Sequence, residues 1–309
     1  MTSGVLRAPR ITDLLGSLNL GEVRGDFPLE KWCTVRVGGA AEAWVKPSTP
    51  DAIVRLLKFN RVQGFPVWLL GGGANTLIGD GGVPGVTLKL PSDLYPEEVD
   101  KASGRITLCG GAAINRLVTL MTKHKLVGAE FLAGIPGTIG GATAMNAGTK
   151  NGECMTRVEA VELATVDGIG WVEAKSIPFR YRHTELPQGA VVTRVRFQLA
   201  EGDLEESAAK MEADLGYRKR TQPLSQPNFG SVFTNPPGDH AGRLIEFVQL
   251  KGHTIGRAQI STLHANWIVN LGGATAHDVV ALMDLAQKRV LDATGVQLTP
   301  EVKRIGVFT

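Results

Sequence analysis

Hydrophobic and polar positions in the first part of the chain predict a strand, a helix and a second strand. Residues 34–45 alternate as a strand that a glycine pair interrupts, and residues 65–70 form a short apolar run typical of a buried strand. Between them, residues 48–62 place apolar side chains at helical spacing, with Thr49 as the expected N-cap and Pro50 in the first turn. This part is therefore expected to mix strands with a helix.

The middle of the chain repeats this mixture. Residues 105–111 are typical of a strand and residues 113–126 of a helix. Residues 157–168 and 190–202 alternate in the manner of half-buried strands. A second sheet that carries a helix is expected here.

The pattern changes near residue 202, where longer helices are predicted. Residues 202–220 predict a helix whose acidic start and basic end suit the helix dipole. Residues 275–295 predict another helix, in which Thr275 and Asp278 resemble a capping box. We place a domain boundary near residue 205 and expect an α+β fold.

Length, charge and cysteine content narrow the class of protein. The 309 residues are enough for about two domains of roughly 150 residues. No apolar run reaches the roughly 18 residues of a membrane span, and no signal peptide is expected. The net charge of +3 is far below that of a nucleic-acid binder. Three scattered cysteines, and histidines without metal-ligand spacing, indicate a cytoplasmic globular protein with no metal site.

Two glycine-rich loops, residues 71–82 and 134–148, each follow an apolar segment. Glycine allows positive φ and lets a ligand approach the backbone, and successive free N–H groups bind anions. Neither loop contains the lysine of a nucleotide triphosphate loop or the GxGxxG spacing of a dinucleotide fold. The loops therefore favour a pyrophosphate within a bound cofactor, although glycines that serve only tight turns are the alternative.

Four side chains are candidates for a role in binding or catalysis. Arg180 and Arg182 are expected on the same side of an extended segment, where a guanidinium can hold a carboxylate, or else face solvent and pair with Glu185. Ser231 follows a glycine and can donate a proton, or it can satisfy a turn. Glu301 lies in a C-terminal segment that we expect to insert into the body of the protein, although an exposed strand-end carboxylate is the alternative.

Two further features are ambiguous. The basic run at residues 217–220 is typical of a solvated helix end, but it can also face a diphosphate. His264 borders an apolar strand and is expected to be structural rather than a metal ligand.

The order and spacing of several motifs resemble those of the UDP-N-acetylenolpyruvoylglucosamine reductases. The resemblance runs from about residue 30 to the C-terminus. It rests on "TVRVGG", "LLGGGANTLIGDGG", "GAEFLAGIPGTIGGATAMNAG", "YRHTELP", "PNFGSVFTNP", "AGRLIE", "ISTLHANWIVN" and "LTPEVKRIG". Each motif alone is weakly specific, whereas the set is highly specific.

The resemblance implies an α+β, two-lobed FAD-binding fold of the vanillyl-alcohol-oxidase type, followed by a C-terminal α+β substrate-binding domain. The FAD-binding domain would span residues 1–205, with lobes of about 1–90 and 91–205, and the substrate-binding domain residues 206–309. Covalent flavin attachment in related folds often uses a histidine of the first lobe. Because the first histidine here is His124, non-covalent FAD is expected.

The resemblance also implies the reaction and its residues. NADPH would reduce the flavin, and the reduced flavin would pass hydride to UDP-N-acetylglucosamine enolpyruvate to give UDP-N-acetylmuramate for peptidoglycan. Arg182 would hold the substrate carboxylate, Glu301 would share a proton or hydrogen bond with it, and Ser231 would protonate the carbanion. The implied cofactor-binding residues are Gly71, Gly72, Gly73, Ala74, Asn75, Thr76, Leu77, Gly134, Ile135, Pro136, Gly137, Thr138, Gly140, Gly141, Asn146 and Ala147.

Substrate binding would involve Tyr181, Asn235, Arg243 and His264. Thr234 stands where relatives commonly carry lysine or arginine, so one contact to the substrate phosphate is either missing or supplied by Arg218, Arg220 or Arg243. The chain also resembles the shorter members without a tyrosine-bearing lid. A monomer is expected.

Two other functions stay open from the sequence. One is an FAD-dependent oxidase of the same fold that acts on another small substrate. The other is a regulatory module that binds flavin or nucleotide without turnover. The motifs "GSVFTNP" and "PEV" favour the reductase.

Overall fold

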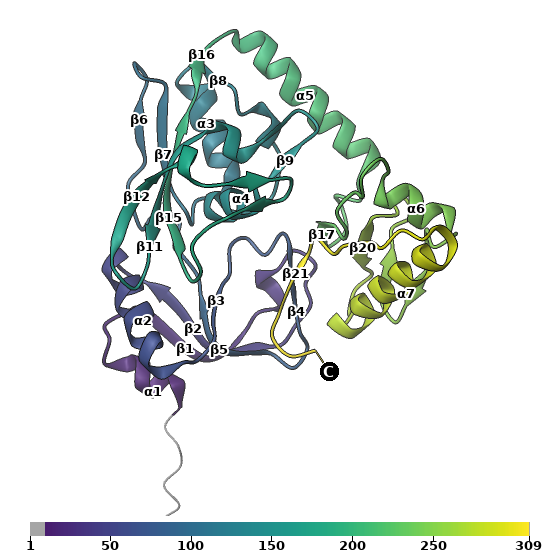
Figure 1. The fold of residues 1–309 in the computed structure, drawn as a ribbon, viewed down its shortest axis with the longest axis horizontal. Helices are drawn as coiled ribbons and strands as arrows, with labels where there is room; N and C mark the ends of the chain where they lie inside the picture. Colours follow the sequence, from purple (N-terminus) through teal and green to yellow (C-terminus); the bar gives the residue numbers. More distant parts are fainter. Residues whose placement is uncertain (1–9, 309) are drawn as a thin grey trace, which may run out of the picture.

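The structure, a computed structural model, describes residues 10–308. Figure 1 shows three parts that follow one another along the chain, coloured purple to blue, teal, and green to yellow. Residues 1–9, with which the predicted first lobe begins, lie outside the described residues. None of the helices within residues 10–308 is both long and apolar enough to cross a bilayer.

The first part is a four-stranded sheet with two helices. Its strand order is β1-β2-β5-β3, with β1 antiparallel to β2 and the remaining pairs parallel. The predicted N-cap is confirmed, because Thr49 Oγ1 accepts a hydrogen bond of 3.2 Å from the N–H of Ala52. Both helices share a core with the sheet. The elements are α1 (Ile11–Gly16), β1 (Gly21–Pro28), β2 (Ala40–Pro47), α2 (Pro50–Gln63), β3 (Val67–Leu69) and β5 (Val83–Leu88).

The strand predicted over residues 34–45 is only partly correct, because β2 begins at Ala40. The preceding loop contains two left-handed residues, Arg36 with φ 57° and Gly38 with φ 113°. An added Cβ on Gly38 would lie 2.5 Å from the Cβ of Ile78. The loop thus turns closely against a neighbouring segment, which an extended strand would not do.

The second part is a five-stranded antiparallel sheet in the order β12-β11-β15-β7-β6. The strands and the helix predicted for this region are confirmed, and the helices share the core of the sheet. Its main elements are β6 (Glu98–Asp100), β7 (Arg105–Cys109), α3 (Ile114–Lys123), α4 (Ile139–Met145), β11 (Val158–Ala164), β12 (Ile169–Glu173) and β15 (Val191–Gln198).

Three short antiparallel strand pairs complete the second part. They are β8 (Leu126–Val127) with β16 (Ala200–Glu201), β9 (Gly148–Thr149) with β10 (Gly152–Glu153), and β13 (Phe179–Arg180) with β14 (His183–Thr184). The last two pairs border the site described below.

The third part is a four-stranded antiparallel sheet in the order β17-β20-β19-β18 with two helices. The predicted capping box is confirmed: Thr275 Oγ1 accepts from the N–H of Asp278 at 3.0 Å, and Asp278 Oδ2 accepts from the N–H of Thr275 at 3.1 Å. The elements are β17 (Asn228–Ser231), α6 (Ala241–Phe247), β18 (Thr254–Ile255), β19 (Ala258–Ile260), β20 (Trp267–Asn270) and α7 (Ala276–Thr294).

The long helix α5 (Leu204–Thr221) leads from the second part to the third, as Figure 1 shows. It still packs on the second part, since Ser207 Oγ donates to Glu130 Oε1 at 2.7 Å and Asn151 Nδ2 donates to Asp214 Oδ1 at 2.8 Å. The predicted boundary between residues 205 and 206 therefore lies at the start of a packed helix and stays a prediction.

The C-terminal segment returns to the first part. Strand β21 (Lys303–Ile305) pairs in parallel with β4 (Thr76–Ile78), so the predicted insertion of this segment is confirmed. One apolar core joins the first part to the third part and the C-terminal segment, and it includes Leu77, Leu298 and Val302. This return carries Glu301 into the lining of the pocket described below.

Candidate active site

A large pocket lies where the three parts meet. Its volume is about 1370 Å³, and its lining draws on residues 69–76, 134–150 and 222–231, together with Arg182 and Glu301. Pockets for one small ligand usually measure roughly 300–1,000 Å³. This pocket therefore has room for a cofactor and a substrate at the same time.

The two glycine-rich loops lie against each other in this pocket. An added Cβ on Gly72 would lie 2.6 Å from the Cα of Gly137, and one on Gly71 would lie 2.9 Å from Thr138 Oγ1. Gly137 also has a φ of 127°, a backbone angle that residues with a side chain rarely adopt. The glycines therefore allow the loops to pack closely while their backbone lines the pocket.

The first loop offers free hydrogen-bond donors. Within residues 10–308, the N–H groups of Gly71, Gly72 and Gly73 form no hydrogen bond with another protein group. Neighbouring free N–H groups bind anions, and a diphosphate is a suitable guest. With the bare glycine backbone and the size of the pocket, these donors fit FAD.

All but two of the predicted cofactor-binding residues line the pocket. The exceptions, Leu77 and Asn146, are fully buried, so their side chains do not line the pocket and their predicted contact with the cofactor stays a prediction. Leu77 belongs to the core that joins the first and third parts. Asn146 ends α4 in a left-handed conformation; its Nδ2 donates to Glu153 Oε2 at 2.9 Å and its Oδ1 accepts from the N–H of Met155 at 3.0 Å. Its amide therefore fastens the loop and does not reach the pocket.

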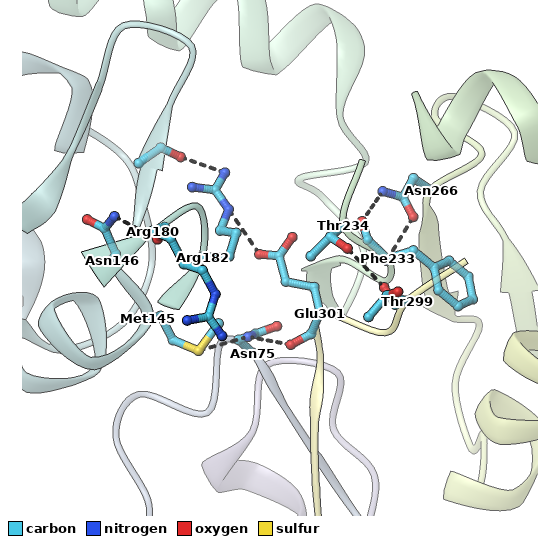
Figure 2. A network of polar contacts seen from close by, with 11 residues as sticks. Asn75, Met145, Asn146, Arg180, Arg182, Phe233, Thr234, Asn266, Thr299 and Glu301 are labelled. Atoms are coloured by element: carbon cyan, nitrogen blue, oxygen red, sulfur yellow. Dashed lines mark hydrogen bonds and ion pairs between the residues drawn. The ribbon is translucent and has the colours of Figure 1, made fainter. Parts of the chain in front are cut away.

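Arg182 and Glu301 form an ion pair across the pocket, and Figure 2 shows their side chains pointing toward each other. The Nε of Arg182 lies 3.2 Å from Oε1 of Glu301, and the two side chains are only 20% and 13% exposed. Arg182 Nη2 also donates to the carbonyl of Gly148 at 3.0 Å. A guanidinium from the second part is thus held next to a carboxyl from the C-terminal segment.

The prediction that Arg180 and Arg182 share one side of an extended segment is wrong. The segment is a tight hairpin of β13 and β14, and Arg182 lies in its turn with a φ of 58°. A non-glycine residue in this conformation is uncommon and is found at functional sites. Arg180 instead faces solvent and pairs with Glu185 at 3.0 Å, which was the alternative for this segment.

The position of Glu301 is set by its backbone. Its N–H donates to the carbonyl of Val232 at 2.8 Å. Its carbonyl accepts from Asn75 Nδ2 at 3.2 Å, as Figure 2 shows. Burial raises the pKa of the Glu301 carboxyl above its usual value, and the Arg182 guanidinium opposes this shift without cancelling it. Glu301 is therefore a carboxyl that holds a proton more readily than an exposed one.

Ser231 lies at the end of β17 and lines the same pocket. The register of β17 with β20 shifts between Asn228 and Ser231, and Gly230 has a φ of 80°. Such irregularities re-aim the next side chain of a strand. The structure thus brings Arg182, Ser231 and Glu301 into one pocket from three separate segments.

The four predicted substrate-binding residues divide into two pairs. Asn235 and His264 line the pocket. Tyr181 and Arg243 do not, so their predicted contact with the substrate stays a prediction. Tyr181 is exposed beside the Arg182 guanidinium, which lies 4.9 Å from its ring centroid. Arg243 forms an exposed ion pair with Asp239 one turn earlier.

The two pocket residues of this group also have structural roles. Asn235 Oδ1 accepts from the N–H of Ala241 at 3.1 Å, at the start of α6. His264 Nδ1 accepts from the N–H of Asn266 at 3.2 Å, and burial lowers the pKa of the imidazole. His264 is thus favoured as a neutral side chain at the pocket wall.

Several pocket residues were not predicted from the sequence as site residues, above all Lys89, Lys150 and Tyr217. Lys150 Nζ lies 5.0 Å from the Tyr217 ring centroid, so this pair connects the β9–β10 turn with α5. The basic run at 217–220 was a signal for this region, and Arg218 from that run lines the pocket. No local signal marks Lys89, which simply follows a buried strand.

Two family models match the chain. Residues 41–171 match an FAD binding domain, and residues 222–305 match the C-terminal domain of UDP-N-acetylenolpyruvoylglucosamine reductase. The first match covers most of the first and second parts of the structure, which contain the two glycine-rich loops. The second covers the part that contains Ser231 and Glu301.

Proteins similar to this chain carry the enzyme name of the second family model. A UDP-N-acetylenolpyruvoylglucosamine reductase of Myxococcus xanthus (strain DK1622) is 66% identical over 294 residues, which cover 94% of this chain and 95% of the relative. One of Anaeromyxobacter sp. (strain Fw109-5) is 52% identical over 309 residues, covering 99% and 96%. The crystal structure of UDP-N-acetylenolpyruvylglucosamine reductase from Thermus caldophilus matches with a TM-score of 0.79 at 35% identity, covering 92% of this chain and 98% of that one. These matches confirm the predicted α+β architecture, a two-lobed FAD-binding fold followed by a C-terminal domain.

Proposed function

The chain belongs to the UDP-N-acetylenolpyruvoylglucosamine reductase family, and we propose that Arg182, Glu301 and Ser231 act directly on the enolpyruvyl substrate. The protein is an FAD-dependent oxidoreductase of peptidoglycan precursor synthesis that uses NADPH. The observation that supports the residue roles is the Arg182–Glu301 pair, which two distant segments form inside a pocket that Ser231 also lines.

The bound flavin would supply the redox chemistry: NADPH would reduce it, and the reduced flavin would give a hydride to the double bond of the substrate. The free N–H groups of residues 71–73 would hold the cofactor diphosphate, with the backbone of residues 134–141 lining the pocket beside them. Because these donors are fixed by the packing of the two loops, they need no rearrangement when the anion binds.

Arg182 holds the carboxylate of the enolpyruvyl group and stabilises the negative charge that develops beside it. Its planar guanidinium suits bidentate contact with a carboxylate. The Gly148 carbonyl and the Glu301 carboxyl fix its orientation before substrate arrives. Glu301 shares a proton with the same carboxylate, in agreement with the raised pKa that burial gives it.

Ser231 donates a proton to the substrate carbon that does not receive the hydride. The Gly230 turn and the register shift of β17 aim this residue differently from an ordinary strand serine. Proton donation by a positioned side chain typically contributes about 10²–10⁴ in rate.

The activity is tested with the purified holoprotein under anaerobic conditions. NADPH should bleach the absorbance of the bound flavin, and UDP-N-acetylglucosamine enolpyruvate should restore it rapidly, with UDP-N-acetylmuramate as the product. Flavin that stays reduced until oxygen is admitted would instead support an oxidase of the same fold.

The role of Ser231 has its own test in the same assay. Ser231→Ala should leave the NADPH-driven step nearly unchanged and slow the substrate-driven step by about 10²-fold or more. Equal losses in both steps would contradict the assignment of Ser231 as proton donor.

We further propose that Arg218 supplies the phosphate contact that Thr234 does not. The Arg218 side chain lines the pocket close to Gly134, and no ion pair within residues 10–308 neutralises it. Burial partly desolvates its guanidinium and thereby lowers the pKa of this group. Thr234 Oγ1 instead donates to the carbonyl of Thr299 at 3.3 Å. The Nε of Arg218 donates to the neutral Gln222 Oε1 at 3.0 Å, and the Asp214 carboxylate acts on its charge without forming a salt bridge. A desolvated cation without a salt bridge favours an anionic ligand.

We also propose that the protein works as a cytoplasmic monomer. Its three cysteines, Cys33, Cys109 and Cys154, are buried and unpaired, as expected in a reducing compartment. Residues of a single chain build the pocket described above. Light scattering after size exclusion should give the monomer mass of 32.9 kDa, and a dimer mass would contradict the proposal.

A further inference from the structure

Lys89 is a lysine of the pocket lining that the roles above do not use. It follows β5 and is half-buried, and its Nζ donates to the carbonyl of Gly71 in the first glycine loop. The Nζ also lies 5.9 Å from the centroid of the Trp32 ring. The lysine is therefore held between an aromatic ring and the glycine loop.

The charge of Lys89 has no carboxylate partner within residues 10–308, although the chain holds many exposed ion pairs elsewhere. Burial lowers the pKa of its ammonium group, and no nearby charge opposes this shift. A lysine that is partly desolvated without an ion pair is uncommon, because the cost of desolvation is not offset. The unpaired charge of Lys89 therefore favours the binding of an anion in the pocket.

The carbonyl of Gly71 and the N–H of Gly72 belong to one planar peptide unit. A charge-assisted hydrogen bond to the carbonyl polarises this unit and strengthens the N–H as a donor. The N–H of Gly72 is one of the three donors that have no protein partner. Lys89 thus acts on the loop that is expected to meet the diphosphate, although it lies outside that loop in the sequence.

We propose that Lys89 is a positioning residue for the cofactor diphosphate: it holds the Gly71 carbonyl, strengthens the Gly72 N–H as a donor and adds a positive charge behind the loop. This inference rests on the assignment of the glycine loops to the diphosphate. It means that the loops do not depend on backbone dipoles alone.

The test compares two flavins on the apoprotein, FAD with its diphosphate and riboflavin without phosphate, by titration of flavin fluorescence. Lys89→Met keeps an unbranched side chain of nearly the same length and removes the charge. It should weaken FAD binding by about 10-fold, the order expected for a hydrogen bond to a charged group, and change riboflavin binding less than 2-fold (about 0.4 kcal/mol). Lys89→Arg should retain most of the FAD affinity.

Lys46→Met is the matched control, because Lys46 is an exposed lysine on the neighbouring strand β2. It should change neither affinity. The FAD affinity of Lys89→Met should also depend less steeply on potassium chloride concentration than that of the wild type, because one cation near the anion is lost. If Lys89→Met does not fold, Lys89→Gln serves in the same titrations.

Equal loss for FAD and riboflavin would reduce Lys89 to a packing residue and overturn the proposal, as would unchanged FAD affinity. A different result tests the loop assignment itself. If the wild-type protein binds FAD no more tightly than riboflavin, then the glycine loops do not hold the diphosphate, whatever Lys89 does.

Discussion

The glycine loops and the Arg182–Glu301 pair face the same pocket but are built in opposite ways. The loops present backbone N–H groups from two continuous stretches, each of which is recognisable in the sequence. The pair presents two charged side chains from segments that are 119 residues apart in numbering and that meet only in the folded chain. The loops suit an anion that stays bound, whereas the pair suits a carboxylate whose charge changes during reaction.

The comparison also separates two kinds of constraint. In the loops, the residue type is imposed by space, because any Cβ at Gly72 would meet the backbone of Gly137. In the pair, it is imposed by chemistry, because only a guanidinium and a carboxyl give this ion pair and this hydrogen bond to Gly148. The four predictions below test these constraints in order of decreasing effect.

Arg182→Ala should produce the largest loss, a fall in kcat/KM of about 10²–10³-fold, because a fixed donor for the developing charge is removed. Arg180→Ala is the matched control two residues away. Arg180 forms only an exposed pair with Glu185, so its loss should change kcat/KM less than 2-fold, by about the worth of a surface ion pair. Steady-state kinetics of both variants give the comparison, and similar losses would remove the distinction between the two arginines.

Gly72→Ala should weaken FAD binding by about 10- to 100-fold, because the added methyl group overlaps the backbone of the second loop and forces the loops apart. Gly170→Ala is the control, since an added Cβ there would meet nothing within 4 Å. The measurement is the bound flavin per protein after dialysis, followed by titration of the apoprotein. Normal FAD content in Gly72→Ala would show that the loops tolerate separation.

Arg218→Ala should raise KM for the nucleotide substrate by about 10-fold with a smaller change in kcat, as expected when one charge-assisted contact to a phosphate is lost. Arg220→Ala, which changes a residue outside the pocket lining on the same helix, should leave KM unchanged. If Arg220→Ala raises KM as much as Arg218→Ala does, the effect comes from the general charge of the helix.

The smallest expected effect concerns stability: Glu301→Gln should change how the free energy of unfolding depends on pH. Burial raises the folded-state pKa of Glu301 above the usual value of about 4.5, so between these two values the folded state binds more protons than the unfolded state. The wild-type protein should therefore lose stability relative to Glu301→Gln as pH rises through this window. Urea unfolding of both proteins at several pH values measures the difference, and a gain with rising pH would contradict the raised pKa.

Much of the fold could be predicted from local patterns. The helices at α2 and α7 were indicated by their periodicity and by Thr49 and Thr275 as caps, since these signals act within one or two turns. The strand over residues 34–45 was overestimated because Arg36 and Gly38 turn left-handed against Ile78, a contact that lies forty residues away.

The candidate site was predicted less completely than the fold. The hairpin turn at Arg182 separates it from Arg180, and the side chain of Asn146 bonds to the protein instead of facing the pocket. The sequence did not mark Lys89 as a site residue, because its hydrogen-bond partner, the Gly71 carbonyl, lies in a loop that meets it only in the folded chain. Each of these outcomes depends on which segments pack together, and periodicity does not report that.

The sequence alone determined the glycine loops, the capped helices and, through its motifs, the family. These features depend on backbone freedom and on contacts between residues that are close along the chain. Only the tertiary structure decided which arginine meets Glu301, which lysine supports the first glycine loop and where the C-terminal strand β21 pairs. Those pairings arise because burying the shared apolar core brings distant segments together, and the partly buried charges that result are stable only beside particular partners.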